Sequence, residues 1–281
     1  MIATERPAGS MTRAQAERWD AAVFDRHSHR TYDGAPLDRT AARALAELAT
    51  EPLNGARVRC VLVEGAEATG AILTGLVGSY GKIVGAPAVL LFVGQTEDPG
   101  HMAAIGYMGQ QAVLEATSHG LATCWVSGSF SREQAARYTN LAPGELVLAV
   151  SPVGLPKAAG TLRRWHDVSM KTFTGSAKRK PLEALVQGPV EANWLQHALE
   201  AARWAPSAVN GQPWRFALAP GRVTVSYEPS LLKGRFVEDP RALDCGIAMA
   251  NLAVGARARG NEGAWDFHGE PGHLAAFRYA I

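Results

Sequence analysis

Residues 205–216 read APSAVNGQPWRF and carry the strongest local signal in the chain. Pro206 ends an Ala-rich helical pattern, an Asn-Gly pair typical of turns follows, and Trp214 starts a run of β-forming residues. One interpretation is an ordinary turn between a helix and a strand, with Trp214 in the core. The other is a binding loop, because three polar side chains stand on an irregular backbone. These are Ser207, Asn210 and Gln212.

Residues 26–30 read RHSHR and form a second signal, about 180 residues before the first. A guanidinium group can bind two oxygens of a phosphate at once, so Arg26 and Arg30 are candidate phosphate ligands. Ser28 can donate a hydrogen bond to a neighbouring polar group. The alternative is a solvated helix end, which an isolated Arg-x-Ser-x-Arg pattern does not exclude.

Together the two segments resemble the divided flavin mononucleotide (FMN) site of the nitroreductase superfamily. In that family FMN lies across a dimer interface. One subunit's Arg-x-Ser-x-Arg segment holds the phosphate and ribityl chain, and the other subunit's Pro-Ser-x-x-Asn-x-Gln-Pro-Trp segment meets the isoalloxazine ring. The resemblance implies a cofactor-binding role for eight residues here. They are Arg26, His27, Ser28, Arg30, Pro206, Ser207, Asn210 and Gln212.

Residues 120–130 read GLATCWVSGSF and resemble the family loop whose backbone N–H points at flavin N5. This resemblance adds Ser127, Gly128 and Ser129 to the cofactor-binding residues. The backbone of Gly128 is expected next to N5, because a residue without a Cβ allows close approach.

Residues 178–183 read KRKPLE and resemble the basic tail that returns to the FMN phosphate. The tail adds Lys178 and Arg179 to the candidate phosphate ligands. A solvated charge run is the alternative interpretation of the same residues. At the opposite end of the cofactor, a cation near the flavin N1/O2 edge favours reduction, and Arg30 is the candidate for that role.

The chain also reads as a degenerate repeat with an offset of 140 residues. The matched pairs are Gly106 and Gly246, Gly120 and Gly260, and Trp125 and Trp265. Duplication predicts two nitroreductase-like halves, residues 13–180 and a shortened 181–281, although Ala-rich helices could match by coincidence. The first half lacks the Gln-Pro-Trp run, and the second half lacks an Arg-x-Ser-x-Arg segment. We therefore expect one FMN per chain, and a monomer in which the duplication replaces the usual dimer.

Composition describes an ordinary globular chain of 281 residues, with 47% hydrophobic and 19% charged residues. A net charge of +2 gives no reason to expect nucleic acid or a membrane surface as partner. The three cysteines are scattered and no spacing suits a metal, so reduced thiols in a cytoplasmic protein are expected. No apolar run reaches the ~20 residues that a membrane helix needs.

Helical and strand patterns are interspersed without strict β-α-β alternation, which favours an α+β fold with a sheet flanked by helices. Expected helices cover residues 13–25, 39–49, 68–77, 102–119, 131–138, 191–204 and 243–259. Expected strands cover residues 58–63, 88–93, 145–150, 215–218, 223–227 and 277–281, and residues 123–127 are expected to form a strand or a loop. A loose tail is expected at residues 1–10, and a linker at 156–180.

The resemblance implies an FMN-dependent oxidoreductase. Hydride from NAD(P)H would reach flavin N5, and the electrons would pass to a small-molecule acceptor such as a nitroaromatic or a quinone. No GxGxxG loop is present, so NAD(P)H is expected only as a transient donor. A flavin-binding protein without turnover is the alternative, and a flavin enzyme of another reaction type is a third. The segments expected to cover the acceptor, residues 66–83 and 231–237, carry no legible motif.

Overall fold

The computed structural model describes residues 11–48, 58–73, 82–157, 178–228, 240–267 and 273–280. The expected tail, most of the expected linker and the segment 231–237 lie outside these ranges. Within them, no helix is both long and apolar enough to cross a membrane.

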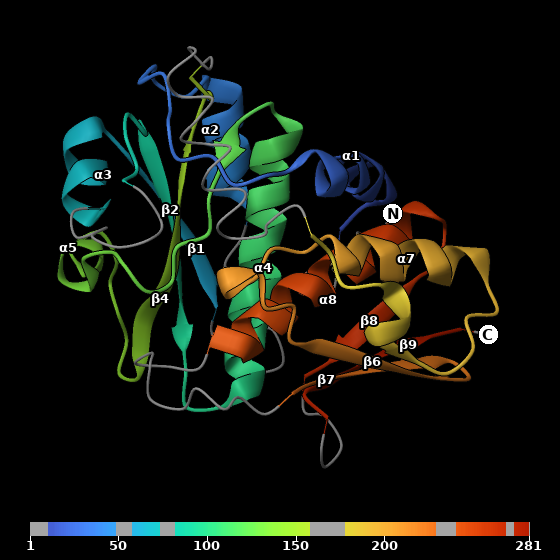
Figure 1. The fold of residues 1–281 in the computed structure, drawn as a ribbon. Helices are drawn as coiled ribbons and strands as arrows, with labels where there is room; N and C mark the ends of the chain where they lie inside the picture. The colour runs from blue at the N-terminus through green and yellow to red at the C-terminus, as the bar shows by residue number, and fades with distance from the viewer. Residues whose placement is uncertain are drawn as a thin grey trace, which may run out of the picture.

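A four-stranded antiparallel sheet forms the first part of the fold, in the order β1-β2-β4-β3. Its strands are β1 (Arg59–Glu64), β2 (Ala88–Gln95), β3 (Ala122–Thr123) and β4 (Glu145–Gly154). Strand β2 is buried along almost its whole length, as its unbroken apolar run predicts for a central strand. Helices α3 (Ala66–Leu73) and α5 (Arg132–Ala136) lie on one side of this sheet, and α4 (Pro99–Ser118) lies on the other (Figure 1).

A five-stranded sheet forms the second part, in the order β5-β6-β7-β9-β8. Its strands are β5 (Val186–Gln187), β6 (Trp214–Ala219), β7 (Arg222–Tyr227), β8 (Gly263–Asp266) and β9 (Ala275–Tyr279). Strand β5 runs parallel to β6, and all other neighbours are antiparallel. Without β5, the order β6-β7-β9-β8 repeats the order β1-β2-β4-β3. Along the chain, a long helix lies between β2 and β3 in the first set and between β7 and β8 in the second.

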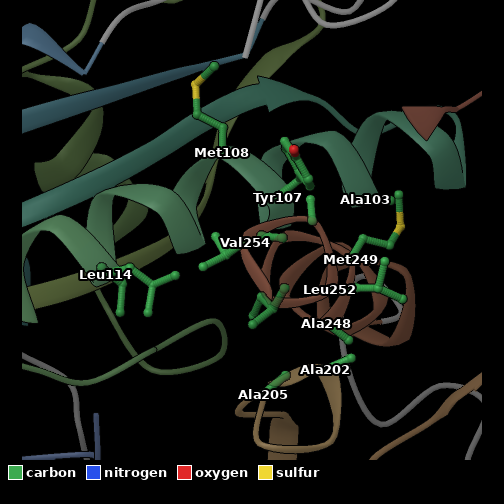
Figure 2. Close-up of a cluster of buried hydrophobic side chains, with 14 of the residues drawn as sticks. Ala103, Tyr107, Met108, Leu114, Ala202, Ala205, Ala248, Met249, Leu252 and Val254 are labelled. Carbon is green, nitrogen blue, oxygen red and sulfur yellow. The ribbon is translucent and has the colours of Figure 1, made fainter. Parts of the chain in front are cut away.

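Helices α4 and α8 (Pro240–Ala258) cross between the two sheets, and α1 (Arg13–Asp25) and α7 (Asn193–Arg203) pack against them (Figure 1). The remaining α-helix, α2 (Arg39–Glu47), packs on α4 and β1. Figure 2 shows α8 nearly end-on, with Met249 and Leu252 between Tyr107 of α4 and Ala202 of α7. Alanine and glycine are frequent along these helices, and small residues allow helix axes to approach closely.

The crossing of α4 and α8 is reciprocal under the 140-residue offset. A Cβ added to Gly106 would lie 2.1 Å from the carbonyl oxygen of Leu243, and one added to Gly246 would meet the carbonyl of Ala103 at closer range. Position 103 corresponds to 243, and 106 to 246, so each helix presents the same two positions to the other. Such self-complementary contacts are the mark of a twofold interface.

Several element boundaries differ from expectation for local reasons. Helix α4 begins at Pro99 rather than residue 102, because the Asp98 side chain accepts from Gly100 N–H and proline suits the first turn. Residues 123–127, expected as a strand or a loop, form mostly a loop, because strand β3 covers only Ala122–Thr123 and an isolated bridge follows at Val126. The short strands β5 and β8 were not predicted, since two residues and a glycine-led four carry little periodicity.

Candidate functional site

The loop between α7 and β6 has a strained backbone. Val209, Asn210 and Gln212 adopt φ angles of 48°, 55° and 48°, in the left-handed region that favours glycine. The buried Asp244 carboxylate on α8 accepts from Ala208 N–H at 3.0 Å and holds the start of this turn. Non-glycine residues in this region cost energy and gather at functional sites, so the geometry makes the loop a candidate binding element.

Val209→Gly is expected to raise the unfolding free energy of the protein by about 1 kcal/mol. A β-branched residue is disfavoured at positive φ, and the Val209 side chain is 59% exposed, so little burial is lost. Chemical denaturation measures the change. Val190→Gly is the matched control, because Val190 is a partly exposed valine outside the left-handed region and should lose stability. A lower unfolding free energy in both variants would contradict backbone strain at Val209.

The side-chain amides of Asn210 and Gln212 hold the basic segment 178–180 against this loop. Asn210 Nδ2 donates to the Lys178 carbonyl at 2.8 Å, and Gln212 Nε2 donates to the same oxygen at 3.2 Å. Gln212 Oε1 accepts from Lys180 N–H at 2.8 Å. The Ser207 hydroxyl oxygen accepts from Gln212 N–H at 3.0 Å. The loop therefore uses its polar side chains to place the basic segment.

Arg179 lies at the centre of this arrangement. Its Nη1 donates to Asn210 Oδ1 at 2.7 Å, its Nη2 donates to the Trp204 carbonyl at 3.1 Å, and its guanidinium stacks 5.6 Å above the Trp204 ring. Its Nε is buried and has no hydrogen-bond partner among the described residues. Burial, and then the charge of Arg203, lower the pKa of Arg179. The side chain is thus held in place, and its buried Nε–H is left for a ligand.

Arg26 is the least compensated charge of the site. It follows the last turn of α1 and is only 8% exposed, yet its Nε and Nη1 are buried without a hydrogen-bond partner in the described chain. Burial first, and then the positive charge of Arg179, lower the pKa of Arg26 to about 10, which leaves it protonated at neutral pH. A buried charge without a partner is costly, so two converging guanidinium groups indicate a site for an anion.

The segment 26–30 is extended and lies beside the end of β3. Ser28 forms a parallel bridge with Thr123, and His29 N–H donates to the Thr123 carbonyl at 2.9 Å. The rings of His27 and His29 lie 4.8 Å apart and so share one face. Because side chains alternate in an extended segment, Arg26, with its neighbours at 28 and 30, takes the opposite face from His27.

The loop that follows β3 continues from this bridge. Val126 exchanges backbone hydrogen bonds with Val150 of β4, and the next three residues, Ser127, Gly128 and Ser129, turn away at the surface. Gly128 is exposed, and a Cβ added there would meet nothing within 4 Å. The described chain therefore has room for a side chain at this position. A requirement for glycine here would have to come from a bound ligand.

The structure thus brings together residues 26–30, 178–180 and 205–212, and sets the start of the 120–130 stretch beside the first of them. Sequence reasoning missed three residues that position this site, namely Trp204, Asp244 and Lys180. A buried acid within the Ala-rich run of α8 was the one visible signal among them.

Comparison with known proteins gives the family of this chain. The family model described as "Putative TM nitroreductase" matches residues 20–256. The chain belongs to this nitroreductase family. The match spans both sheets and takes in residues 26–30, 178–180 and 205–212, so the family relationship covers the candidate site. No curated protein matches the sequence.

A solved structure shows the fold of this nitroreductase-family chain. A protein from Thermotoga maritima described as "a putative nitroreductase" is 18% identical, with a TM-score of 0.60, covering 99% of this chain and 98% of that one. An FMN-dependent nitroreductase from Clostridium difficile is 13% identical over 50% of this chain and 88% of its own, with a TM-score of 0.42. A Bacteroides fragilis nitroreductase with bound FMN is 16% identical over 51% and 91%, with a TM-score of 0.39.

Proposed function

We propose that this protein is an FMN-dependent oxidoreductase of nitroreductase type. The observation that carries the proposal is Arg26, whose buried guanidinium has two nitrogens without a partner among the described residues, beside the charge of Arg179. A phosphate dianion would satisfy both groups, and bidentate contacts to guanidinium are among the stronger hydrogen bonds in proteins. The family to which the chain belongs makes FMN the phosphate-bearing ligand of choice.

Different residues of the site would contact different parts of FMN. Arg26 and Arg179, with Lys178 at the rim, would take the phosphate, and Ser28 would reach the ribityl chain. The strained loop that carries Ser207, Asn210 and Gln212, together with the loop at Ser127, Gly128 and Ser129, would border the isoalloxazine ring, and Arg30 would take its N1/O2 edge. When bound, FMN supplies hydride chemistry, taking a hydride from NAD(P)H at N5 and passing electrons to a nitroaromatic, quinone or similar acceptor.

We further propose that the chain is a single-chain pseudo-dimer that works as a monomer. The shared strand order of the two sheets and the reciprocal contact of Gly106 and Gly246 support this proposal, because they reproduce within one chain the symmetry of a dimer. The anion-binding guanidinium of Arg26 comes from the first half and the strained loop at Asn210 from the second.

One FMN per chain is the expected stoichiometry, because one segment 26–30 and one segment 206–214 are present. Flavin released by heat from a known amount of protein, after reconstitution with excess FMN, measures the ratio. A ratio near two would contradict the divided site. A ratio near zero would contradict flavin binding altogether.

Anaerobic bleaching tests the activity itself. The FMN-loaded protein is mixed with NADPH or NADH, and absorbance is followed at the flavin band. Rapid bleaching that reverses on adding a nitroaromatic or quinone is the expected result. Stable yellow colour with either donor would contradict the oxidoreductase and favour a protein that binds flavin without turnover.

A further inference from the structure

A chain of three hydrogen bonds, called the relay below, crosses the core between the 127–129 loop and the 206–212 loop. Trp125 Nε1 donates to Gln110 Oε1 at 3.1 Å, and Gln110 Nε2 donates to Asn251 Oδ1 at 2.9 Å. Asn251 Nδ2 then donates to the Ala201 carbonyl at 3.0 Å. Gln110 is fully buried and Asn251 is 1% exposed. Each amide uses its oxygen and its nitrogen once, in the same direction.

The two ends of this relay are attached to the two loops. Trp125 stands two residues before Ser127 in the 127–129 loop, and its ring packs 4.4 Å from Phe92 between centroids. A Cβ at Gly109 would lie 2.6 Å from this ring, so the indole occupies space that only glycine leaves open.

At the other end, the Ala201 carbonyl belongs to the last turn of α7, where it also accepts from Trp204 N–H at 3.2 Å. The strained 206–212 loop starts five residues later, at Pro206. Asn251 therefore secures the helix end from which that loop departs.

The relay breaks the 140-residue repeat. Positions 110 and 251 correspond to Ala250 and Gln111, and the matching indole, Trp265, donates instead to the Met249 carbonyl at 3.1 Å. Among the described residues, these hydrogen bonds therefore have no equivalent at the positions related by the 140-residue offset, just as the candidate site has none.

We infer that Gln110 and Asn251 are positioning residues that couple the 127–129 loop to the 206–212 loop, and so hold the two borders of the flavin ring in register. Neither side chain reaches the site, so both act through Trp125 and the end of α7. A buried amide without a hydrogen-bond partner is costly. Loss of one side chain of the relay therefore leaves the next amide unpaired and weakens the whole chain of hydrogen bonds. The ring-binding part of this inference rests on the proposed function, whereas the coupling of the two loops does not.

Hydrogen exchange of the flavin-free protein tests the coupling directly. Gln110→Met keeps the side-chain length and removes the amide, and we expect exchange at residues 126–129 and at 206–212 to quicken together, by about tenfold. Asn251→Leu should have the same effect on both loops, and the double variant no greater one. Gln111→Met is the matched control, a buried glutamine on the same helix outside the relay, and should leave both loops unchanged.

Flavin binding supplies the second measurement. FMN affinity should fall about tenfold in Gln110→Met, with a shifted absorption band of the bound flavin, and neither should change in Gln111→Met. A merely structural role would lower stability without moving the band. If Gln110→Met does not fold, Trp125→Phe breaks the first link and keeps a ring. Faster exchange at one loop alone, or at neither, would overturn the coupling. A wild-type protein that binds no FMN would instead overturn the proposed function.

Discussion

Arg26→Ala is expected to weaken FMN binding by about 2–5 kcal/mol, or roughly 30- to 5,000-fold, while riboflavin affinity barely changes. Arg26 is buried, is held next to Arg179, and lacks a partner on two nitrogens among the described residues. A phosphate would complete both contacts, and riboflavin differs from FMN only in lacking it. Fluorescence titration of the flavin-free protein with each ligand measures the two affinities.

The same position should show the opposite effect on stability. Arg26→Met keeps most of the side-chain volume and removes the buried charge, so the flavin-free protein should gain about 1–3 kcal/mol of unfolding free energy. Arg137→Ala is the control for the loss of one positive charge, because Arg137 is exposed and its ion pair is with the exposed Glu133, four residues earlier. Equal losses of FMN and riboflavin affinity in Arg26→Ala would show that Arg26 does not bind the phosphate.

Gly246→Ala is expected to destabilise the protein by about 3 kcal/mol or more, or to prevent folding. The new Cβ would overlap the Ala103 carbonyl, which is backbone of α4 and cannot rotate away. The helices must therefore separate along a crossing that also packs Tyr107 and Met249 (Figure 2). Alanine's better helix propensity returns only about 1 kcal/mol. Urea unfolding, or the yield of folded protein, measures the loss.

Gly70→Ala is the matched control for this substitution. Gly70 lies inside α3, and a Cβ added there meets nothing within 4 Å, so the propensity gain should appear alone as about 0.5–1 kcal/mol of added stability. Gly106→Ala should resemble Gly246→Ala, since its Cβ would lie 2.1 Å from the Leu243 carbonyl. Wild-type stability in both crossing variants would mean that the two helices do not touch as described.

The sequence by itself determined the α+β class, most elements and the family, because these depend on local signals. Helix α1 covers Arg13–Asp25 as predicted, and β2 is the buried central strand that its apolar run predicts. The short motifs at residues 26–30 and 205–216 were legible for the same reason: each is complete within a few residues. The cofactor roles assigned to their side chains stay predictions.

Only the tertiary structure decided how these motifs meet. Arg26 has two nitrogens without a partner in the described part of the chain, because packing buries it beside Arg179, 153 residues further along, and no local pattern encodes that proximity. The left-handed Val209 runs against local preference, so only surrounding contacts can impose it. The same holds for Gln110 and Asn251, polar residues in apolar helices whose partners lie on other elements. Burial and pairing at long sequence separation are properties of the packed chain.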